Sequence, residues 1–241
     1  MIDHRLNTND AKDMGLTDPS GQPLSAPAPL VYDIDGEFNP ASVVSTLHAM
    51  GKKVICYVDV GVYEDYRTDA WKFPASVIGS PDAGWNGSYW LDIRQLDILL
   101  PIMQARFEMC RDKGFDAIEP DEIDGYANSS GFPLTYADQI RYNTAIADLA
   151  HSMGMSIGLK GDIDQVADLW QKFDWSLNEQ CFQYRECQPL ATYFVANGKA
   201  VFQVEYAAKI DPAVFCPQAA TLGFNSMKMP LNLDGGRIPC P

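Results

Sequence analysis

Apolar and polar positions follow two alternating patterns along most of the chain. Short apolar runs rich in β-branched residues are typical of buried strands, and longer stretches with apolar residues every three or four positions are typical of amphipathic helices. The predicted strands cover residues 30–34, 53–58, 115–119, 156–160, 174–178, 200–205 and 224–228, with a weak first strand at 2–6. The predicted helices cover residues 40–50, 95–113, 135–153, 162–172, 189–197 and 212–222.

Residues at the helix ends support this division. Gly51, Gly114 and Gly154 follow three of the predicted helices, where glycine commonly ends a helix in the left-handed conformation. Thr135 stands where a capping residue is expected, and Asp138 occupies the position of the acidic partner in a capping box. The remaining long segments, residues 1–29 and 61–94, are predicted to be an irregular N-terminal segment and a long loop after the third strand.

Alternating strands and helices favour an α/β fold with a parallel sheet, and no linker interrupts the alternation, so we expect one domain over residues 1–241. A doubly wound open sheet and a closed (β/α)8 barrel both fit this order. Charged residues close nearly every predicted strand, as expected where all strand ends surround one pocket. An open sheet concentrates them at one switch point, and no glycine-rich phosphate motif follows a strand. We therefore predict a TIM-like barrel.

The segment 115–126 is the most informative for chemistry. An apolar run leads directly into several acids, Pro120 excludes a helix, and Gly125 permits a turn. Clustered carboxylates repel one another, which raises some of their pKa values, as acid/base chemistry requires. The strand-end and neighbouring charged residues predicted to line the pocket are Asp33, Asp35, Asp59, Asp92, Arg94, Glu119, Asp121, Glu122, Asp124, Lys160, Glu179 and Glu205.

Three interpretations of these acids remain open on the residues alone. Two carboxylates can form a glycosidase pair, or three or four can hold Mg²⁺ or Ca²⁺. They can also be structural, pairing with Arg67, Arg94 and Lys160. Aromatic residues near strand ends favour sugar, because their faces cover the apolar C–H face of a pyranose. Those predicted to line the pocket are Tyr57, Trp85 and Tyr126.

Charge and cysteine content narrow the protein class. With 18 basic and 32 acidic residues the net charge is −14, which disfavours nucleic acid as a partner. The acids are either a solvated surface or a field that attracts a cationic substrate. No apolar run approaches the roughly 18 residues of a membrane span. The Met1 start lacks a signal peptide, and we expect one to have been removed, because six cysteines favour secretion.

The cysteine positions suggest some pairings and argue against a metal centre. No CxxC pair and no histidine at zinc-ligand spacing is present, so a Cys/His metal site is not expected. Cys181 with Cys187, and Cys216 with Cys240, are the expected disulfides. Cys56 lies in an apolar run and Cys110 on a predicted helix, so these two are interpreted either as buried thiols or as disulfide cysteines whose pairing the sequence leaves open.

Ten segments in one order together resemble the glycoside hydrolases known as endo-α-1,4-polygalactosaminidases. They span almost all of residues 30–230. The segments are Val31-Tyr-Asp-Ile-Asp35, Gly51-Lys-Lys-Val-Ile-Cys-Tyr57, Trp90-Leu-Asp-Ile-Arg94, Gly114-Phe-Asp-Ala-Ile-Glu-Pro-Asp121, Asp124-Gly-Tyr126, Gly131-Phe132, Gly158-Leu-Lys160, Asn178-Glu-Gln-Cys181, Gly198-Lys-Ala-Val201 and Val204-Glu-Tyr206.

The resemblance implies a secreted TIM-like barrel that cleaves within α-1,4-linked galactosamine polymers, without a cofactor. It assigns Asp121 as the nucleophile and Glu179 as the acid/base. A polymer of free amines is cationic, which gives the net charge of −14 a specific purpose. A monomer is expected. The alternative is a non-catalytic barrel that binds the same polysaccharide.

The chain departs from the family pattern beside the presumed nucleophile and at three other positions. Glu122 and Gly161 stand where the family usually has Asn, and Asn86 and Ser88 replace a usual Pro and Glu. A like charge at Glu122 is expected to raise the pKa of Asp121.

Overall fold

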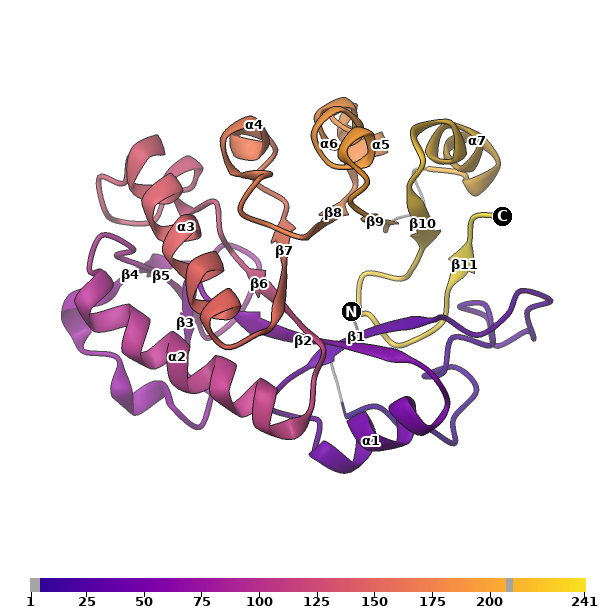
Figure 1. Ribbon diagram of the computed structural model, residues 1–241, viewed down its shortest axis with the longest axis horizontal. Helices are drawn as coiled ribbons and strands as arrows, with labels where there is room; N and C mark the ends of the chain where they lie inside the picture. Colours follow the sequence, from indigo (N-terminus) through magenta and orange to yellow (C-terminus); the bar gives the residue numbers. More distant parts are fainter. Residues whose placement is uncertain (1–4, 207–209) are drawn as a thin grey trace.

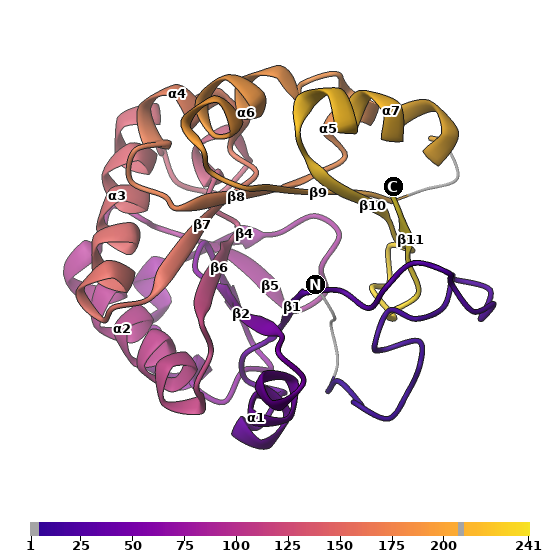
Figure 2. The same cartoon turned by 45° about the vertical axis from the view of Figure 1, so that its right-hand side comes forward.

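A computed structural model describes residues 5–206 and 210–241 of the chain. Within these residues the main element is a curled sheet of eight strands in the order β1-β2-β6-β7-β8-β9-β10-β11. The first seven strands of this order run parallel, and helices cover the outer side of the curl (Figure 1 and Figure 2). The predicted α/β fold is confirmed, as a TIM-like half-barrel.

The elements alternate as the sequence pattern predicts. The strands are β1 Val31–Asp35, β2 Lys53–Asp59, β3 Val62–Glu64, β4 Ile78–Pro81, β5 Ser88–Leu91, β6 Ala117–Asp121, β7 Ser156–Lys160, β8 Trp175–Glu179, β9 Val201–Glu205, β10 Asn225–Lys228 and β11 Ile238–Pro239. The α-helices are α1 Ala41–Ala49, α2 Leu96–Lys113, α3 Tyr136–Ser152, α4 Val166–Leu169, α5 Cys181–Tyr184, α6 Gln188–Tyr193 and α7 Pro212–Leu222.

Helix α2 shows how the apolar pattern becomes packing. Its Leu99, Met103 and Phe107 recur at helical spacing and are fully buried against the sheet. Gly114 then ends the helix at a φ of 91°, in the left-handed region that glycine adopts without strain. Helix α3 begins with the predicted capping box between Thr135 and Asp138. Local sequence therefore sets the ends of both long helices.

The segment predicted as a long loop at 61–94 contains a small antiparallel sheet, in the order β3-β5-β4. Its strands have three or four residues each, too few to show a clear alternation. The helices predicted at 162–172 and 189–197 are also shorter, because each includes a 3₁₀ turn, at Ile163–Gln165 and Val195–Asn197. The short helix α5 was not predicted.

Described segments near the N-terminus and the C-terminus lie beside the edge strands of the sheet. The predicted strand at 2–6 falls largely on residues 1–4, outside the described residues. The eighth strand of the described sheet is β11, which pairs antiparallel with β10 and was not predicted. Beside it, the Arg237 side chain donates to the carbonyl of Gly15 at 2.8 Å, and Tyr32 of β1 donates to the carbonyl of Met14 at 3.0 Å. The N-terminal segment is thereby tied to both edge strands.

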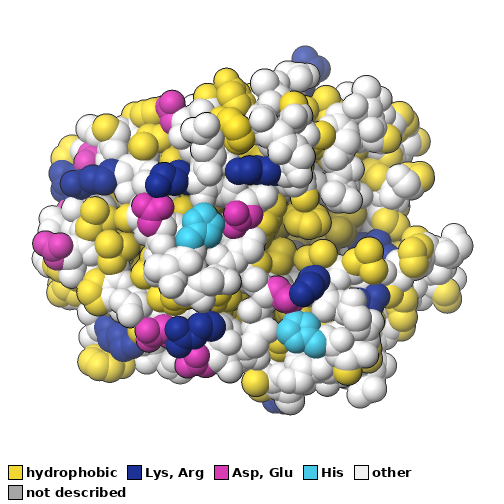
Figure 3. Space-filling model, in the orientation of Figure 1, with side chains coloured by type: hydrophobic (Ala, Val, Ile, Leu, Met, Phe, Trp, Pro, Cys, Tyr) yellow, Lys and Arg dark blue, Asp and Glu magenta, His cyan; other side chains and the backbone are white. Residues whose placement is uncertain are grey.

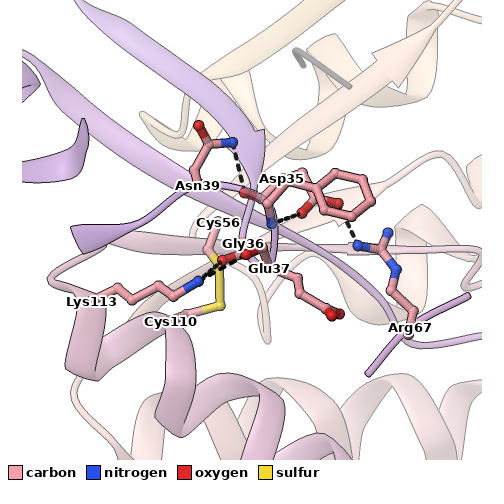
Figure 4. The surroundings of a disulfide bond; sticks show 9 residues. Asp35, Gly36, Glu37, Asn39, Cys56, Arg67, Cys110 and Lys113 are labelled. Carbon is pink, nitrogen blue, oxygen red and sulfur yellow. Dashed lines mark hydrogen bonds and ion pairs between the residues drawn. A yellow bond between two sulfur atoms is a disulfide. The ribbon is translucent and has the colours of Figure 1, made fainter. Parts of the chain in front are cut away.

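Three disulfides cross-link the described residues, and one of them decides between the two interpretations of Cys56 and Cys110. Cys181–Cys187 and Cys216–Cys240 are confirmed. The interpretation as buried thiols is wrong for Cys56 and Cys110, which form a third disulfide between β2 and α2 (Figure 4). Both are fully buried, and only the packing of that helix on that strand brings them together. None of the described helices is long and apolar enough to cross a membrane.

Candidate active site

Lys160 contacts acidic residues on the two strands that flank its own strand in the sheet. It ends β7, which lies between β6 and β8 in the sheet, so the ends of these three strands meet. Its ammonium nitrogen Nζ lies 2.8 Å from Oε1 of Glu119 and 2.9 Å from Oδ1 of Asp121, both on β6. It also lies 3.6 Å from Oε1 of Glu179, the last residue of β8. One buried cation therefore stands between the two residues predicted to be catalytic.

This cation determines the ionisation of Asp121. Burial acts to raise the pKa of Asp121, but the charge and hydrogen bond of Lys160 outweigh it and hold the pKa below its usual value. Burial acts to lower the pKa of Lys160, and the charges of Asp121, Glu119 and Glu179 hold it well above its usual value instead. Asp121 is thus a carboxylate and Lys160 an ammonium ion at neutral pH.

The expected effect of Glu122 on its neighbour is wrong. Burial and the charges of Asp121 and Asp59 raise the pKa of Glu122 itself to about 10, while that of Asp121 is lowered. The physical reason is that Lys160 bonds to Asp121 and not to Glu122. The backbone N–H of Glu122 also donates to Oδ1 of Asp121 at 3.0 Å. Repulsion between the two carboxyls therefore favours a proton on Glu122 over a proton on Asp121.

Two tyrosines complete the surroundings of the pair. Tyr57 of β2 donates a hydrogen bond to Asp121, which further lowers the pKa of that carboxyl. Tyr206 donates to Oε1 of Glu179 at 2.5 Å. Because Oδ1 of Asp121 and Oε1 of Glu179 both contact the same nitrogen, they lie at most about 6.5 Å apart, the two Lys160 distances laid end to end.

The pair lies between two hollows, which share Asp121, Glu122 and Glu179. We call the first the acidic hollow. Its other lining residues are Ile123, Asp124, Tyr126, Ala127, Lys160, Gly161, Asp162, Ile163, Asp164, Asn178, Gln180 and Glu186. We call the second the aromatic hollow. Its other lining residues are Tyr57, Asp59, Glu64, Tyr66, Arg67, Asp82, Trp85, Ser88, Tyr206, Leu231 and Leu233.

Most of the residues predicted for the site come together here. Two of them lie outside both hollows: Glu119 of β6 accepts from Lys160, and burial together with the neighbouring Glu119 raises the pKa of Asp33 of β1 well above its usual value. The predicted residues that line either hollow are Tyr57, Asp59, Trp85, Asp121, Glu122, Asp124, Tyr126, Lys160 and Glu179.

Four further predicted residues, besides Asp33 and Glu119, line neither hollow. Asp35 is fully buried and pairs with Arg67 at 2.6 Å, close to the Cys56–Cys110 disulfide (Figure 4). Asp92 and Arg94 pair with each other, also at 2.6 Å.

The fourth, Glu205, accepts hydrogen bonds from the N–H of Phe182 and the side chain of Gln203, both at 2.9 Å. Asp35, Asp92, Arg94 and Glu205 thus have structural partners in the described part of the chain.

The sequence interpretation missed several lining residues. Tyr206 is the one that the sequence pattern could have identified most easily, because it directly follows the end of β9. The others come from the short strand β3, which Glu64 ends, and from loops and short turns, none of which shows a clear periodicity. They are Glu64, Tyr66, Arg67, Asp82, Asp162, Asp164 and Glu186.

The charges are distributed unevenly over the molecule. On the face shown in Figure 3, basic and acidic side chains lie among one another. In the acidic hollow, seven carboxyl residues line the wall with a single cation, Lys160. Among residues 5–206 and 210–241, no group of three or more Asp, Glu, His or Cys side chains is arranged to hold a metal ion.

Comparisons with known proteins identify a family and solved structures that are similar to this chain. The model of glycoside-hydrolase family GH114 matches residues 14–241. The crystal structure of Ega3 from Aspergillus fumigatus in complex with galactosamine superposes with a TM-score of 0.83 at 37% identity, covering 93% of this chain and 92% of that one. No curated protein matches the chain.

A more distant structure shares the fold. The glycoside hydrolase domain of PelA from Pseudomonas aeruginosa superposes with a TM-score of 0.67 at 12% identity, covering 86% of this chain and 90% of that one.

Proposed function

The chain belongs to glycoside-hydrolase family GH114, and we propose from this premise that it cleaves within galactosamine-containing polysaccharide by a retaining mechanism. The observation that carries the proposal is the pair formed by Asp121 and Glu179, which both contact Lys160 and both line the acidic and the aromatic hollow.

The separation of the pair favours retention of configuration. Retaining glycosidases have carboxyl groups about 5–5.5 Å apart, whereas inverting ones have them about 6.5–9.5 Å apart to admit a water molecule. The oxygens of Asp121 and Glu179 that contact Lys160 can be no more than about 6.5 Å apart, which excludes separations in the greater part of the inverting range.

The two residues have different tasks in this mechanism. The ionised Asp121 attacks the anomeric carbon, while Glu179 gives a proton to the departing glycosidic oxygen. Water then attacks the glycosyl–enzyme bond, and Glu179 takes the proton of that water. In the described part of the chain, Tyr206 and Lys160 both contact Oε1 of Glu179, which leaves Oε2 to carry the transferred proton.

The cleft on both sides of the pair suits an endo-acting enzyme. Sugar units on one side of the cleaved bond lie in the acidic hollow, and units on the other side meet Trp85 and Tyr66 in the aromatic hollow. Protonated galactosamine units carry positive charges, which complement the carboxyl groups that line the acidic hollow. The similarity to Ega3, whose structure contains galactosamine, supports this substrate class.

The three disulfides support an extracellular, oxidising location, because disulfides persist in such compartments. We further propose that the enzyme acts there as a single-domain monomer, with Asp35, Asp92, Arg94 and Glu205 supporting the walls of the site.

Product analysis tests the proposal directly. The protein is incubated with deacetylated and with N-acetylated galactosamine polymer, and the products are identified by mass spectrometry. Short oligosaccharides released from within the chain, in the presence and absence of EDTA, are the expected result. Binding of either polymer without shorter products, or complete loss of activity in EDTA, contradicts the proposal.

A further inference from the structure

Glu122 is a cleft carboxyl without a cation. It lines both the acidic and the aromatic hollow. Its neighbour Asp121 bonds to Lys160, but within residues 5–206 and 210–241 no side chain or backbone N–H donates to the Glu122 carboxyl group. The side chain of Glu122 is therefore available to a ligand at the junction of the two hollows.

The groups that face Glu122 are also acidic. They come from separate elements: Asp59 from the end of β2, Asp82 from the loop after β4, and Asp121 and Asp124 from the end of β6 and its loop. Burial and these four charges raise the pKa of Glu122 to about 10, so the carboxyl is neutral at physiological pH.

A second carboxyl in the acidic hollow also lacks a donor. Asp162 is only 7% exposed, and its Oδ1 has no hydrogen-bond partner among the described residues, while Oδ2 accepts from Asn143 at 3.0 Å. Burial and the charges of Asp124 and Asp164 raise the pKa of Asp162 to about 8. This buried carboxyl oxygen without a donor is available to a ligand that supplies one.

The backbone holds Glu122 in a strained position. Its φ of 57° is left-handed, which is uncommon for a residue with a long side chain. A Cβ on Gly61 would lie 1.5 Å from the carbonyl oxygen of Glu122, so only glycine allows this contact. Strain of this kind persists where the surrounding structure fixes a functional side chain.

We propose that Glu122 selects the nitrogen substituent of the sugar bound beside Asp121, donating as a neutral acid to the oxygen of an acetamido group, or accepting as a carboxylate from the ammonium of a free amine. This inference rests on the proposed function. It concerns which substituent the same site accepts.

The two binding modes differ by one proton. When an ammonium group binds, Glu122 releases its proton to solvent and forms a charged pair, and no bond of the sugar changes. When an acetamido group binds, the proton stays on Glu122 and none is released. A charge-assisted hydrogen bond is stronger than a neutral one, so loss of the charged pair is expected to weaken amine binding about tenfold.

Calorimetry measures that proton. Oligosaccharides of galactosamine and of N-acetylgalactosamine are titrated into the Glu179→Gln variant at about pH 6, where ordinary amines are protonated. Two buffers with different heats of ionisation give the number of protons released. We expect about one proton per bound galactosamine oligosaccharide and none for the acetylated one.

Two further variants assign the proton. Adding Glu122→Gln to Glu179→Gln should abolish proton release and weaken amine binding about tenfold, with acetamide binding changed less than about twofold. Adding Asp162→Asn instead should preserve the proton release, because Glu122 is still present. The Asn side chain keeps an oxygen that accepts the hydrogen bond from Asn143. Proton release that persists without Glu122 overturns the inference.

If the galactosamine oligosaccharide binds with the same heat in both buffers, no proton is released and the inference is overturned. The proposed function is not affected by that result, because the oligosaccharide still binds. If neither oligosaccharide binds any variant, the proposed function fails and the inference fails with it.

Discussion

The ammonium nitrogen of Lys160 lies 2.9 Å from Oδ1 of Asp121. Lys160 is buried and Asp121 is largely shielded from solvent, so each would be costly to ionise alone. Together they stabilise each other's charge, and this leaves Asp121 as an anion beside Glu122, which keeps its proton. The groups around this contact, and the disulfide between β2 and α2, each give a testable prediction.

Replacement of Lys160 by Met should impair both activity and stability. Burial then dominates at Asp121 and raises its pKa, so the acid limb of the pH–activity profile moves to higher pH. The free energy of unfolding should fall by about 3–5 kcal/mol, because buried carboxylates lose their counter-ion. Urea unfolding and pH–rate profiles measure the two effects.

Lys172→Met is the matched control, since Lys172 forms an exposed ion pair with Asp148, and it should change stability by less than about 1 kcal/mol. An unchanged pH profile in Lys160→Met contradicts the role assigned to the cation.

Asp121→Asn and Glu179→Gln should each lower kcat by at least about 10³-fold while the protein stays folded. Each substitution keeps the size of the side chain and removes the group that attacks carbon or transfers a proton. Reducing-end assays measure turnover, and circular dichroism with thermal unfolding measures the fold. Asp148→Asn, on the surface, serves as control. Near-normal turnover in either cleft variant removes that residue from the catalytic pair.

Glu122→Gln should stabilise the protein in a pH-dependent manner. The pKa of Glu122 is raised from 4.5 to about 10, so above pH 4.5 the unfolded chain releases a proton that the folded chain retains. Stability therefore falls as pH rises from 4.5 towards 10.

Removing this group should increase the free energy of unfolding by about 3 kcal/mol at most at pH 7, and by almost nothing at pH 4. Urea unfolding at the two pH values gives the comparison. An equal effect at both values is the result that contradicts a protonated Glu122.

Replacing Cys56 and Cys110 together by Ala should lower the free energy of unfolding by about 2–4 kcal/mol. The disulfide joins residues 54 positions apart, so it restricts a long loop in the unfolded chain. Urea unfolding of the oxidised protein measures the loss. The Cys181–Cys187 pair, which is six positions apart, provides the comparison and should give a smaller loss. A larger loss at that short loop is incompatible with this account.

Periodicity predicted the long elements well, because their burial is one-sided and regular. Helix α2 ends at Gly114 as expected, and α3 begins at the predicted Thr135 cap. The antiparallel sheet of β3, β4 and β5 was not predicted, because its strands are too short to display a pattern. Strand β11 was missed for the same reason.

For the site, the sequence by itself determined which side chains end the parallel strands. Asp121, Lys160 and Glu179 had to share one edge, because neighbouring parallel strands end on the same side of a sheet. Only the tertiary structure decided their charges. Lys160 lies within hydrogen-bond distance of Asp121, whereas Glu122 has no such cation and its pKa is raised. Differences of a few ångströms decide this, and the order of residues does not encode them.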